Sequence, residues 1–435
     1  MTDTTAAPSV AARTSAADFW QTDRARRRRK ARYAADFRLR LYGIAAISAA
    51  ILLLGTLVTS LVATGYLGFI ETRIAMTFDI DPELVDEADL RGSDWRGVVQ
   101  QSISREFPDL AEENYRGVAT MFTQPTPFIV RNRVMDDPSL VGRSVEMSIP
   151  ASDIIDQLAK GRVDLDSPEN RRRVTDFQAR AFEVMQERGM ISIVPNWGLF
   201  TDWDSRFPEL AGLRNALVGS FYALLVCFLI SFPMGVAAAV YLEEFAPKNR
   251  FTDIIEVNIN NLAAVPSIVF GLLGLAVFLN VFGLPRSAPL VGGMVLSLMT
   301  LPTIIIVTRA SLKAVPPSIR EAALGVGASK HQMLWHHVLP LAMPGILTGT
   351  IIGLAQALGE TAPLLLIGMN ASIAGASGGL LEASTALPTQ IYIWADSPER
   401  GFQALTSAGI LVLLGFLIVM NGFAIFLRNR LERKW

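Results

Sequence analysis

One ionisable residue, Glu360, stands inside a long apolar stretch that otherwise carries no charge. An ionisable group in a membrane span is costly, and such a residue usually faces an aqueous path or a partner. Spacings of four, three and four residues separate Gly349, Gly353, Gln356 and Glu360, which predicts that they share one helical face. We interpret Gln356, Glu360 and the adjoining Thr361 as candidates for lining such a path. The alternative for Glu360 is a salt bridge to a partner subunit.

A second group of polar residues, at 318–340, lies between two apolar stretches and reads SIREAALGVGASKHQMLWHHVLP. It contains two capping signals with a glycine break between them: Ser318 with Glu321, Gly325 with Gly327, and Ser329 with Gln332. The pattern predicts two short helices set at an angle. Carried on a membrane bundle, they would form a docking element on which a soluble partner can push. The alternative is an amphipathic loop that only links two spans.

Several other chemistries lack the residues that they need. The chain contains no Gly-Lys dipeptide, which excludes a phosphate-binding P-loop. All three histidines lie in the 318–340 segment, and His331 and His336 are five residues apart, so they do not share a helical face. The single cysteine, Cys227, lies in an apolar run and is interpreted as a small buried hydrophobe. We therefore predict no catalytic residue, no metal site and no cofactor.

The composition, 51% hydrophobic with a mean hydropathy of +0.36, indicates a polytopic membrane protein. Six uncharged stretches reach the roughly 20 residues that a membrane-spanning helix needs: 41–70, 215–242, 257–285, 287–308, 338–359 and 401–427. The further apolar run 361–381 is predicted to finish the fifth span and then to form an external or re-entrant segment. In the fifth span small residues recur at every fourth position, which favours close helix packing: Gly345, Gly349, Gly353 and Ala357.

Basic residues predict the orientation of the chain. The tail 1–40 holds ten Lys or Arg against four acids, which places it in the cytoplasm. Six spans return the C-terminus to the same side, together with the loop 309–340. The first span is too long for a cleaved signal peptide and is interpreted as an uncleaved anchor. The basic cluster 24–32 favours lipid headgroups over nucleic acid. Arg309, at the inner end of the fourth span, marks the membrane boundary or offers a cation to the path.

Residues 71–214 separate the first two spans and are numerous enough to form their own core. A helix is predicted over 94–107, and another from an N-cap at Ser167 to Arg188, where Gly189 stops it. Short apolar runs at 145–149 and 190–194 are typical of strands. The sequence thus predicts an external α+β domain with an acidic, solvated surface, and docking of a solute-binding protein is one hypothesis for its role.

The 318–340 segment resembles the EAA loop of ABC importer permeases. The matching positions are Glu321, Ala322, Ala323, Gly327, Leu339 and Pro340, and the departure is His337, where that family usually has Ile. The resemblance implies that this loop couples the chain to separate ATPase subunits. It also implies the type I ABC importer permease fold, an all-α bundle of six transmembrane helices in a multi-pass protein of the plasma (inner) membrane.

Two further stretches resemble the PstA-type permeases of phosphate ABC importers: GETAPLL at 359–365 and NLAAVPSIVFG at 261–271. The resemblance covers about 212–430, within the predicted permease core 215–435. It implies a second, PstC-like permease subunit, two PstB-like ATPase subunits and an external PstS-like phosphate-binding protein. The tail and the inserted domain look like an extension found in a subset of these proteins.

One position departs from the resemblance. Some PstA-type proteins have an Arg four residues before the glutamate, where this chain has Gln356. Gln356 can donate hydrogen bonds but supplies no charge. A permease for molybdate, sulfate or phosphonate therefore remains an alternative, against which the GETAP segment argues. A membrane sensor with an external ligand domain is a second alternative, although the last eight residues leave no room for a signalling domain and the docking loop would be unexplained.

Overall fold

The computed structural model describes residues 23–370 and 379–431. The chain divides into two compact units, 1–60 and 61–435. The described part of the first unit belongs to one long helix, α2 (Asp23–Gly65), and its described side chains are exposed as far as residue 60. The helix starts well before the predicted span 41–70, because the Arg- and Lys-rich tail is itself made of good helix formers. It ends five residues before the predicted boundary, and Ile70 belongs to a strand.

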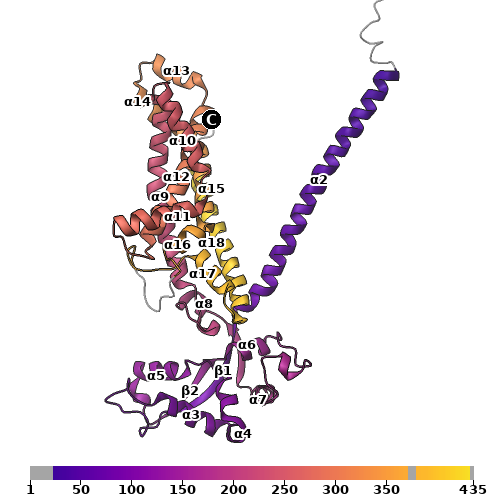
Figure 1. Ribbon diagram of the computed structural model, residues 1–435, viewed down its shortest axis with the longest axis vertical. Coiled ribbons are helices and arrows are strands. Elements are labelled where there is room, and N and C mark those ends of the chain that lie inside the picture. The colour runs from indigo at the N-terminus through magenta and orange to yellow at the C-terminus, as the bar shows by residue number, and fades with distance from the viewer. Residues whose placement is uncertain (1–22, 371–378, 432–435) are drawn as a thin grey trace, which may run out of the picture. The chain divides into compact units, whose positions relative to one another are not determined.

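The inserted domain contains a three-stranded antiparallel sheet in the order β2-β1-β3 (Figure 1). The strands are β1 (Ile70–Asp79), β2 (Ser144–Pro150) and β3 (Ile191–Pro195). The two predicted strands are confirmed, whereas the central strand was missed because its first residue was counted in the preceding span. Ile74, Met76 and Phe78 alternate with less buried neighbours and form part of the domain core, as period-two burial requires.

Helices cover this sheet and complete the core: α3 (Trp95–Glu106), α4 (Pro108–Ala119), α5 (Thr126–Asp136), α6 (Asp153–Ala159) and α7 (Asp176–Glu187). The helix predicted over 94–107 is confirmed, and Asp94 caps it by accepting from Gly97 N. The predicted N-cap at Ser167 is wrong. Its hydroxyl instead donates to Asp164, and α7 begins nine residues later with a capping box of Thr175 and Gln178.

The short helix α8 (Gly198–Thr201) lies near the end of residues 71–214. The membrane core contains the helices α9 (Arg214–Val240), α10 (Arg250–Ala263), α11 (Ser267–Leu273), α12 (Pro289–Ala314), α13 (Pro317–Gly325), α14 (Lys330–Met333), α15 (Leu339–Gly359), α16 (Ala362–Leu366), α17 (Leu387–Ala395) and α18 (Gly401–Leu431). Within the described residues, five helices are long and apolar enough to cross a membrane, or six if one bent pair counts as a span. The helix α12 is the most buried of them and packs between α9 and α15.

The third predicted span, 257–285, is not one straight helix. It consists of α10 and of α11, which continues as a π-helix to Val281, and the two parts meet at 101°. Pro266 stands at the break. Proline has no N–H for the helical ladder and disfavours helical geometry in the residue before it.

The run 361–381 also differs from the prediction. Its described part contains α16 and a turn, while 371–378 lie outside the described residues.

The buried Lys160 at the end of α6 holds this helix against the N-terminal end of the inserted domain. The Lys160 ammonium donates to the carbonyls of Leu67 and Ile70, at 2.9 and 2.8 Å, and pairs with Asp156 at 2.5 Å. Asp156 in turn accepts from the Thr72 backbone N–H at 2.9 Å. The side chain of Lys160 is 6% exposed, so this pairing satisfies a charge that would otherwise be costly to bury.

Two carboxyl groups of unit 61–435 have pKa values displaced in opposite directions. Burial raises the pKa of Glu209, whose Oε2 is buried without a hydrogen-bond partner among the described residues, and the charges of Asp153 and Asp156 raise it further. The hydrogen bond from the Ser144 hydroxyl and the Arg105 guanidinium lower the pKa of Asp79. A raised pKa means that folding takes up a proton, so the ionised Glu209 destabilises the fold as pH rises from about 4.5 through the raised value.

We therefore expect Glu209→Gln to raise the apparent melting temperature at pH 7.5 and to have little effect well below pH 4.5. Each kcal/mol recovered should shift the midpoint by about 2–4 °C. The matched control is Asp79→Asn, which should lower the midpoint at pH 7.5 and lose this effect as pH falls through the lowered pKa. Thermal-shift curves of the solubilised protein from pH 8 to below pH 3.8 measure both variants. Parallel curves for wild type and Glu209→Gln at every pH would contradict the expectation.

Candidate functional site

The polar segment between α12 and α15 begins with the helix α13. Its N-cap is Pro316, with Pro317 at the first helical position, and no side chain caps it. The predicted capping box of Ser318 and Glu321 is therefore wrong. Because Pro317 is preorganised for the first helical position, the helix starts before Ser318, which places both residues inside the helix rather than at its cap. Both side chains are exposed.

The second predicted capping box is present. The Ser329 hydroxyl accepts from the Gln332 N–H, and the Gln332 side chain accepts from the Ser329 N–H at 2.9 Å. Gly327, with φ of +88°, makes the turn that precedes it. However, the helix that starts here is not short. It continues through a π-helical turn at Leu334–Val338 into α15, so that 330–359 form one apolar helix. The loop contains one separate short helix, α13, rather than two.

The residues of the EAA pattern divide between a packed face and an exposed face. Ala323 and Leu339 are buried in a cluster with Leu312, Met333 and Val338, which joins α13 to α12 and α15. The other pattern residues are less buried: Ser318, Glu321, Ala322 and Gly327 are exposed, and Pro340 is half-buried. The pattern thus combines anchoring positions with positions available to a partner.

Three large apolar side chains extend this exposed face, and the sequence reading did not single them out. Leu324, Val326 and Trp335 are 45%, 86% and 61% exposed. Exposed apolar side chains grouped on a polar loop mark an interaction surface. The sequence could have indicated them, because they are large apolar residues within an otherwise polar loop. We call the exposed residues Ser318, Glu321, Ala322, Leu324, Val326 and Trp335 the coupling face.

Arg320 braces the coupling face, and sequence reasoning missed it as well. Its guanidinium donates to the carbonyls of Leu312 and Val315, at 2.8 and 2.7 Å, and to Glu244 at 2.8 Å. The side chains of Arg320 and Glu244 are 21% and 11% exposed. A charged pair removed this far from water needs all of its hydrogen bonds. Arg320 therefore connects the start of α13 to the end of α12 and to the π-helical turn that follows α9.

Arg309 is also committed to ion pairs. It contacts Glu256 on α10 at 2.6 Å and Glu243 at 3.4 Å, and Lys313 approaches Glu243 at 3.5 Å. The Arg309 side chain is 15% exposed. In this conformation its charge joins α12 to α10 and is not free to meet an anion.

The predicted shared face of Gly349, Gly353, Gln356 and Glu360 is not formed. Gly349 and Gly353 are buried, whereas Gln356 is exposed. Glu360 lies outside the helix, in extended backbone with φ −75° and ψ 125°. Pro363 has no N–H to donate to the carbonyl of Gly359, so α15 ends there. The side chains of Gln356 and Glu360 form no hydrogen bond or ion pair with the described residues, and Thr361 directly follows Glu360.

The small residues of α15 lie where this helix approaches α12. A Cβ on Gly345 would overlap the Ser311 side chain, and a Cβ on Gly349 would overlap Val307. Ala357 is fully buried. At Gly353 a Cβ would lie 3.8 Å from the Thr303 methyl carbon, an ordinary contact. The close approach is therefore concentrated at Gly345 and Gly349.

This geometry predicts different outcomes for two Gly→Ala substitutions in the same helix. Gly349→Ala should destabilise the protein by about 1–3 kcal/mol, because the β-branched Val307 cannot move aside without disturbing α12. Gly353→Ala is the matched control and should be tolerated. The apparent melting temperature of each solubilised variant measures the difference. Equal midpoints for the two variants would contradict the proposed contact.

Comparisons with known proteins agree with these features. Residues 231–433 match the family described as "Binding-protein-dependent transport system inner membrane component", and residues 26–169 match a domain of unknown function, DUF3333. The family match covers the coupling face and most of the membrane core. Together with the helical core and the small sheet of the inserted domain, it confirms the predicted fold class, a mostly helical type I ABC importer permease with an inserted α+β domain, and it identifies a multi-pass inner membrane protein.

Matches to individual proteins are more specific than the family match. The chain is 33% identical to "Phosphate transport system permease protein PstA" of Haemophilus influenzae over 225 residues, which are 52% of this chain and 78% of that protein. It is 32% identical to the PstA of Xylella fastidiosa strain Temecula1 over 54% of this chain and 81% of that protein.

A third relative, "Probable ABC transporter permease protein YqgI" of Bacillus subtilis, is 38% identical over 159 residues, 35% of this chain, and the matched region spans about half of that relative, 52%. The matches to the two PstA proteins extend over most of their length. On this similarity, the chain belongs to the PstA family of phosphate transport system permease proteins.

Proposed function

We propose that this chain is the membrane subunit through which an ATP-driven importer moves inorganic phosphate into the cytoplasm. Its similarity to PstA proteins over most of their length supports phosphate as the solute. The observation that carries the mechanism is the coupling face, an exposed patch braced to three membrane helices through Arg320 and the Ala323 cluster. Such a permease acts with ATPase subunits and a binding protein and has no ATPase site of its own. The specific partners that we propose are a PstC-like permease, two PstB-like ATPases and a PstS-like phosphate-binding protein.

The packing of the coupling face supports transmission of movement. A partner that displaces α13 would pull on Arg320 and press on the buried cluster of Ala323, Leu312 and Val338. The cluster belongs to α12 and α15 as well as α13, so these helices would shift together. Closely packed elements change between discrete arrangements rather than deform continuously. ATP binding by the partner can therefore bias an equilibrium between outward and inward access.

We place the predicted topology in the same proposal. The tail 1–40, the loop 309–340 and the C-terminus are cytoplasmic, and the inserted domain 71–214 is extracytoplasmic. The basic tail and the coupling face support this orientation, since both are expected on the ATPase side. The acidic domain then faces the side from which a phosphate-binding protein would deliver its ligand.

Gln356, Glu360 and Thr361 are proposed to line the translocation path near the end of α15. An exposed amide and a carboxylate with no described partner at a helix end support this role. In the assembled importer these groups would face the second permease subunit or water. A carboxylate repels phosphate, so Glu360 would orient water and hydrogen-bond donors rather than bind the anion directly.

Replacing Glu360 should separate transport from assembly. Glu360→Ala is expected to lower phosphate uptake at least tenfold, the loss that corresponds to about 1.4 kcal/mol, while the subunits still copurify. The control is Glu382→Ala, another glutamate between α15 and α18. Uptake and copurification of the four-subunit complex measure the two effects. Failure of Glu360→Ala complexes to assemble would instead assign Glu360 a structural contact with a partner subunit.

Uptake of labelled phosphate tests the proposed function itself. Cells that lack this chain are compared with and without its restoration, and unlabelled phosphate, sulfate and molybdate compete for uptake. Restored uptake that only unlabelled phosphate suppresses is the expected result. Restoration of molybdate or sulfate uptake instead would retain the permease assignment and change the solute, and Gln356 would be the first residue to substitute.

A further inference from the structure

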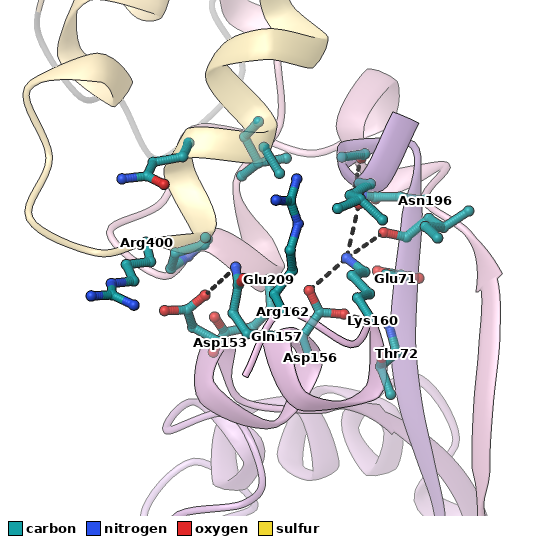
Figure 2. A pocket seen from close by; sticks show the side chains of 18 of the residues that line it. Glu71, Thr72, Asp153, Asp156, Gln157, Lys160, Arg162, Asn196, Glu209 and Arg400 are labelled. Atoms are coloured by element: carbon teal, nitrogen blue, oxygen red, sulfur yellow. Dashed lines mark hydrogen bonds and ion pairs between the residues drawn. The ribbon is translucent and has the colours of Figure 1, made fainter. Parts of the chain in front are cut away.

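Two adjoining cavities lie where the inserted domain meets the start of α18, and they differ in charge. The first, of about 330 Å³, is lined by the carboxylates of Glu71, Asp153, Asp156 and Glu209 together with three cations (Figure 2). The second, of about 230 Å³, is lined by five arginines: Arg162, Arg171, Arg172, Arg173 and Arg400. The two cavities share Asp153, Gln157, Arg162 and Arg400, so they form one continuous hollow with a cationic end.

The side chains of four of the five arginines form no hydrogen bond or close ion pair with the described residues. Arg162, Arg171, Arg173 and Arg400 are exposed, and the charge of Arg173 interacts at longer range with Asp153 and Glu399. Arg172 differs, since its side chain is 9% exposed, pairs with Asp176 and donates to the Leu165 carbonyl at 2.9 Å. Arg172 therefore holds the backbone of this wall in place, while the side chains of Arg171 and Arg173 are exposed and line the cavity.

The acids that line the cationic cavity are already engaged. Asp164 accepts from the Ser167 hydroxyl at 2.8 Å and from the Asp166 N–H at 3.1 Å. Asp153 accepts from the Gln157 amide at 3.4 Å and lies against the start of α18, where a Cβ on Gly401 would overlap its Oδ1. These two carboxylates and Glu399, whose charge interacts with Arg173, are still fewer than the four guanidinium groups that form no close ion pair. The cavity keeps an excess of positive charge.

The arginines come from distant parts of the sequence and are held by the fold. Lys160 fixes α6 to β1, and the Arg162 backbone N–H then closes the end of α6 by donating to the Gln157 carbonyl at 2.9 Å. Arg400 immediately precedes α18 and reaches the same cavity because Gly401 allows α18 to touch Asp153. Figure 2 shows Arg162 extending into the hollow, with Arg400 on the neighbouring wall.

Unpaired cations gathered around one cavity repel one another, by about 1 kcal/mol for each pair at 4 Å even in water. A tetrahedral oxyanion would remove this repulsion and would satisfy several guanidinium donors at once. We propose that the cationic cavity is a binding site for a phosphate-type oxyanion on the inserted domain. The choice of phosphate rests on the proposed function, and free phosphate and the phosphate of a lipid headgroup share the required chemistry.

Chemical labelling of arginine tests this site in the assembled importer. Phenylglyoxal reacts with accessible guanidinium groups, and mass spectrometry of the digested protein reports the rate at each arginine. Labelling is compared in detergent with added phosphate and with chloride at the same ionic strength. At a phosphate concentration ten times Kd, about a tenth of the sites stay open, so labelling at Arg162 and Arg400 should slow roughly tenfold. Arg133, exposed on α5 outside the cavity, is the internal control.

Nanodiscs distinguish the source of the phosphate group. Slow labelling of Arg162 and Arg400 in phosphatidylglycerol nanodiscs without added phosphate, but not in detergent with phosphate, would assign the site to a lipid headgroup. Slow labelling in detergent with phosphate would assign it to the free anion. If the labelling rates at Arg162 and Arg400, like the rate at Arg133, change neither with phosphate nor with lipid, the proposed site is overturned.

A double variant provides a second test. Arg162→Gln with Arg400→Gln should abolish the phosphate protection of Arg171 and Arg173, whereas Arg133→Gln should preserve it. Retained protection in the double variant would also overturn the site. Uptake of labelled phosphate by the wild-type complex is measured in parallel. A wild type that imports phosphate without arginine protection refutes only the site, and a wild type that imports no phosphate refutes the proposed function.

Discussion

Reversing the charge of Glu321 is expected to abolish phosphate uptake in a complex whose membrane subunits still insert. Glu321 is exposed on the coupling face, and its side chain forms no hydrogen bond or ion pair with the described residues, so Glu321→Lys should not disturb the fold. A like-charge contact placed in an interface costs several kcal/mol, and about 2.8 kcal/mol already weakens association roughly 100-fold. We therefore expect loss of ATPase copurification together with loss of uptake.

The control for this prediction is Glu187→Lys, an exposed charge reversal on the inserted domain. It should copurify with the ATPase subunits and support normal uptake. Val326→Asp offers an independent route to the same result, because it removes the most exposed apolar contact of the coupling face without touching Glu321. Normal copurification and uptake by both Glu321→Lys and Val326→Asp would refute the coupling face as the ATPase contact.

Removing Arg320 is expected to destabilise the coupling loop and to uncouple it from the membrane helices. Arg320→Ala leaves Glu244 without its partner and removes the guanidinium hydrogen bonds to the carbonyls of Val315 and Leu312, of which the Leu312 carbonyl still accepts from the Val315 N–H at 3.3 Å. Loss of one partner from such a pair costs about 2–4 kcal/mol, less than in a fully buried site because both side chains keep some contact with water. ATP hydrolysis should then continue with little phosphate uptake.

A double-mutant cycle separates this pairing from a general loss of stability. Arg320→Ala combined with Glu244→Gln should be more stable than Arg320→Ala alone, because the variant no longer contains an unpaired carboxylate. Arg250→Ala, at an exposed arginine on α10, is the control. The ratio of phosphate imported to ATP hydrolysed measures coupling, and thermal midpoints measure stability. Additive effects in the cycle would show that Arg320 and Glu244 act independently.

Local residue order was sufficient where one signal had no competitor. Long uncharged runs predicted the spans of α9, α12, α15 and α18 near their observed positions, because the bilayer leaves few alternatives to a helix. Side-chain caps with adjacent partners, such as Ser329 with Gln332, were also predictable. The Ser318 cap failed because Pro317, which starts a helix as well, competed with it and set the first turn earlier.

Other features depend on contacts that sequence spacing does not contain. A 4-3-4 rhythm places residues on one face only while the helix continues, and the missing N–H of Pro363 ends α15 before Glu360. The central strand β1 becomes recognisable through its pairing with strands more than 60 residues away. Arg320 differs from other loop arginines only because Glu244 and the carbonyls of Leu312 and Val315 accept its hydrogen bonds.

The identity of the chain as a PstA-type permease could be read from its residues, because the EAA loop and the GETAP segment are short motifs and the spans follow from hydropathy. The tertiary structure was needed to show which motif residues are buried and which are exposed, and to show that Arg309 is paired. It was also needed to bring Arg162 and Arg400, 238 positions apart, to one cavity. Local motifs depend on short-range geometry, whereas burial and charge pairing depend on what the rest of the fold places beside each side chain.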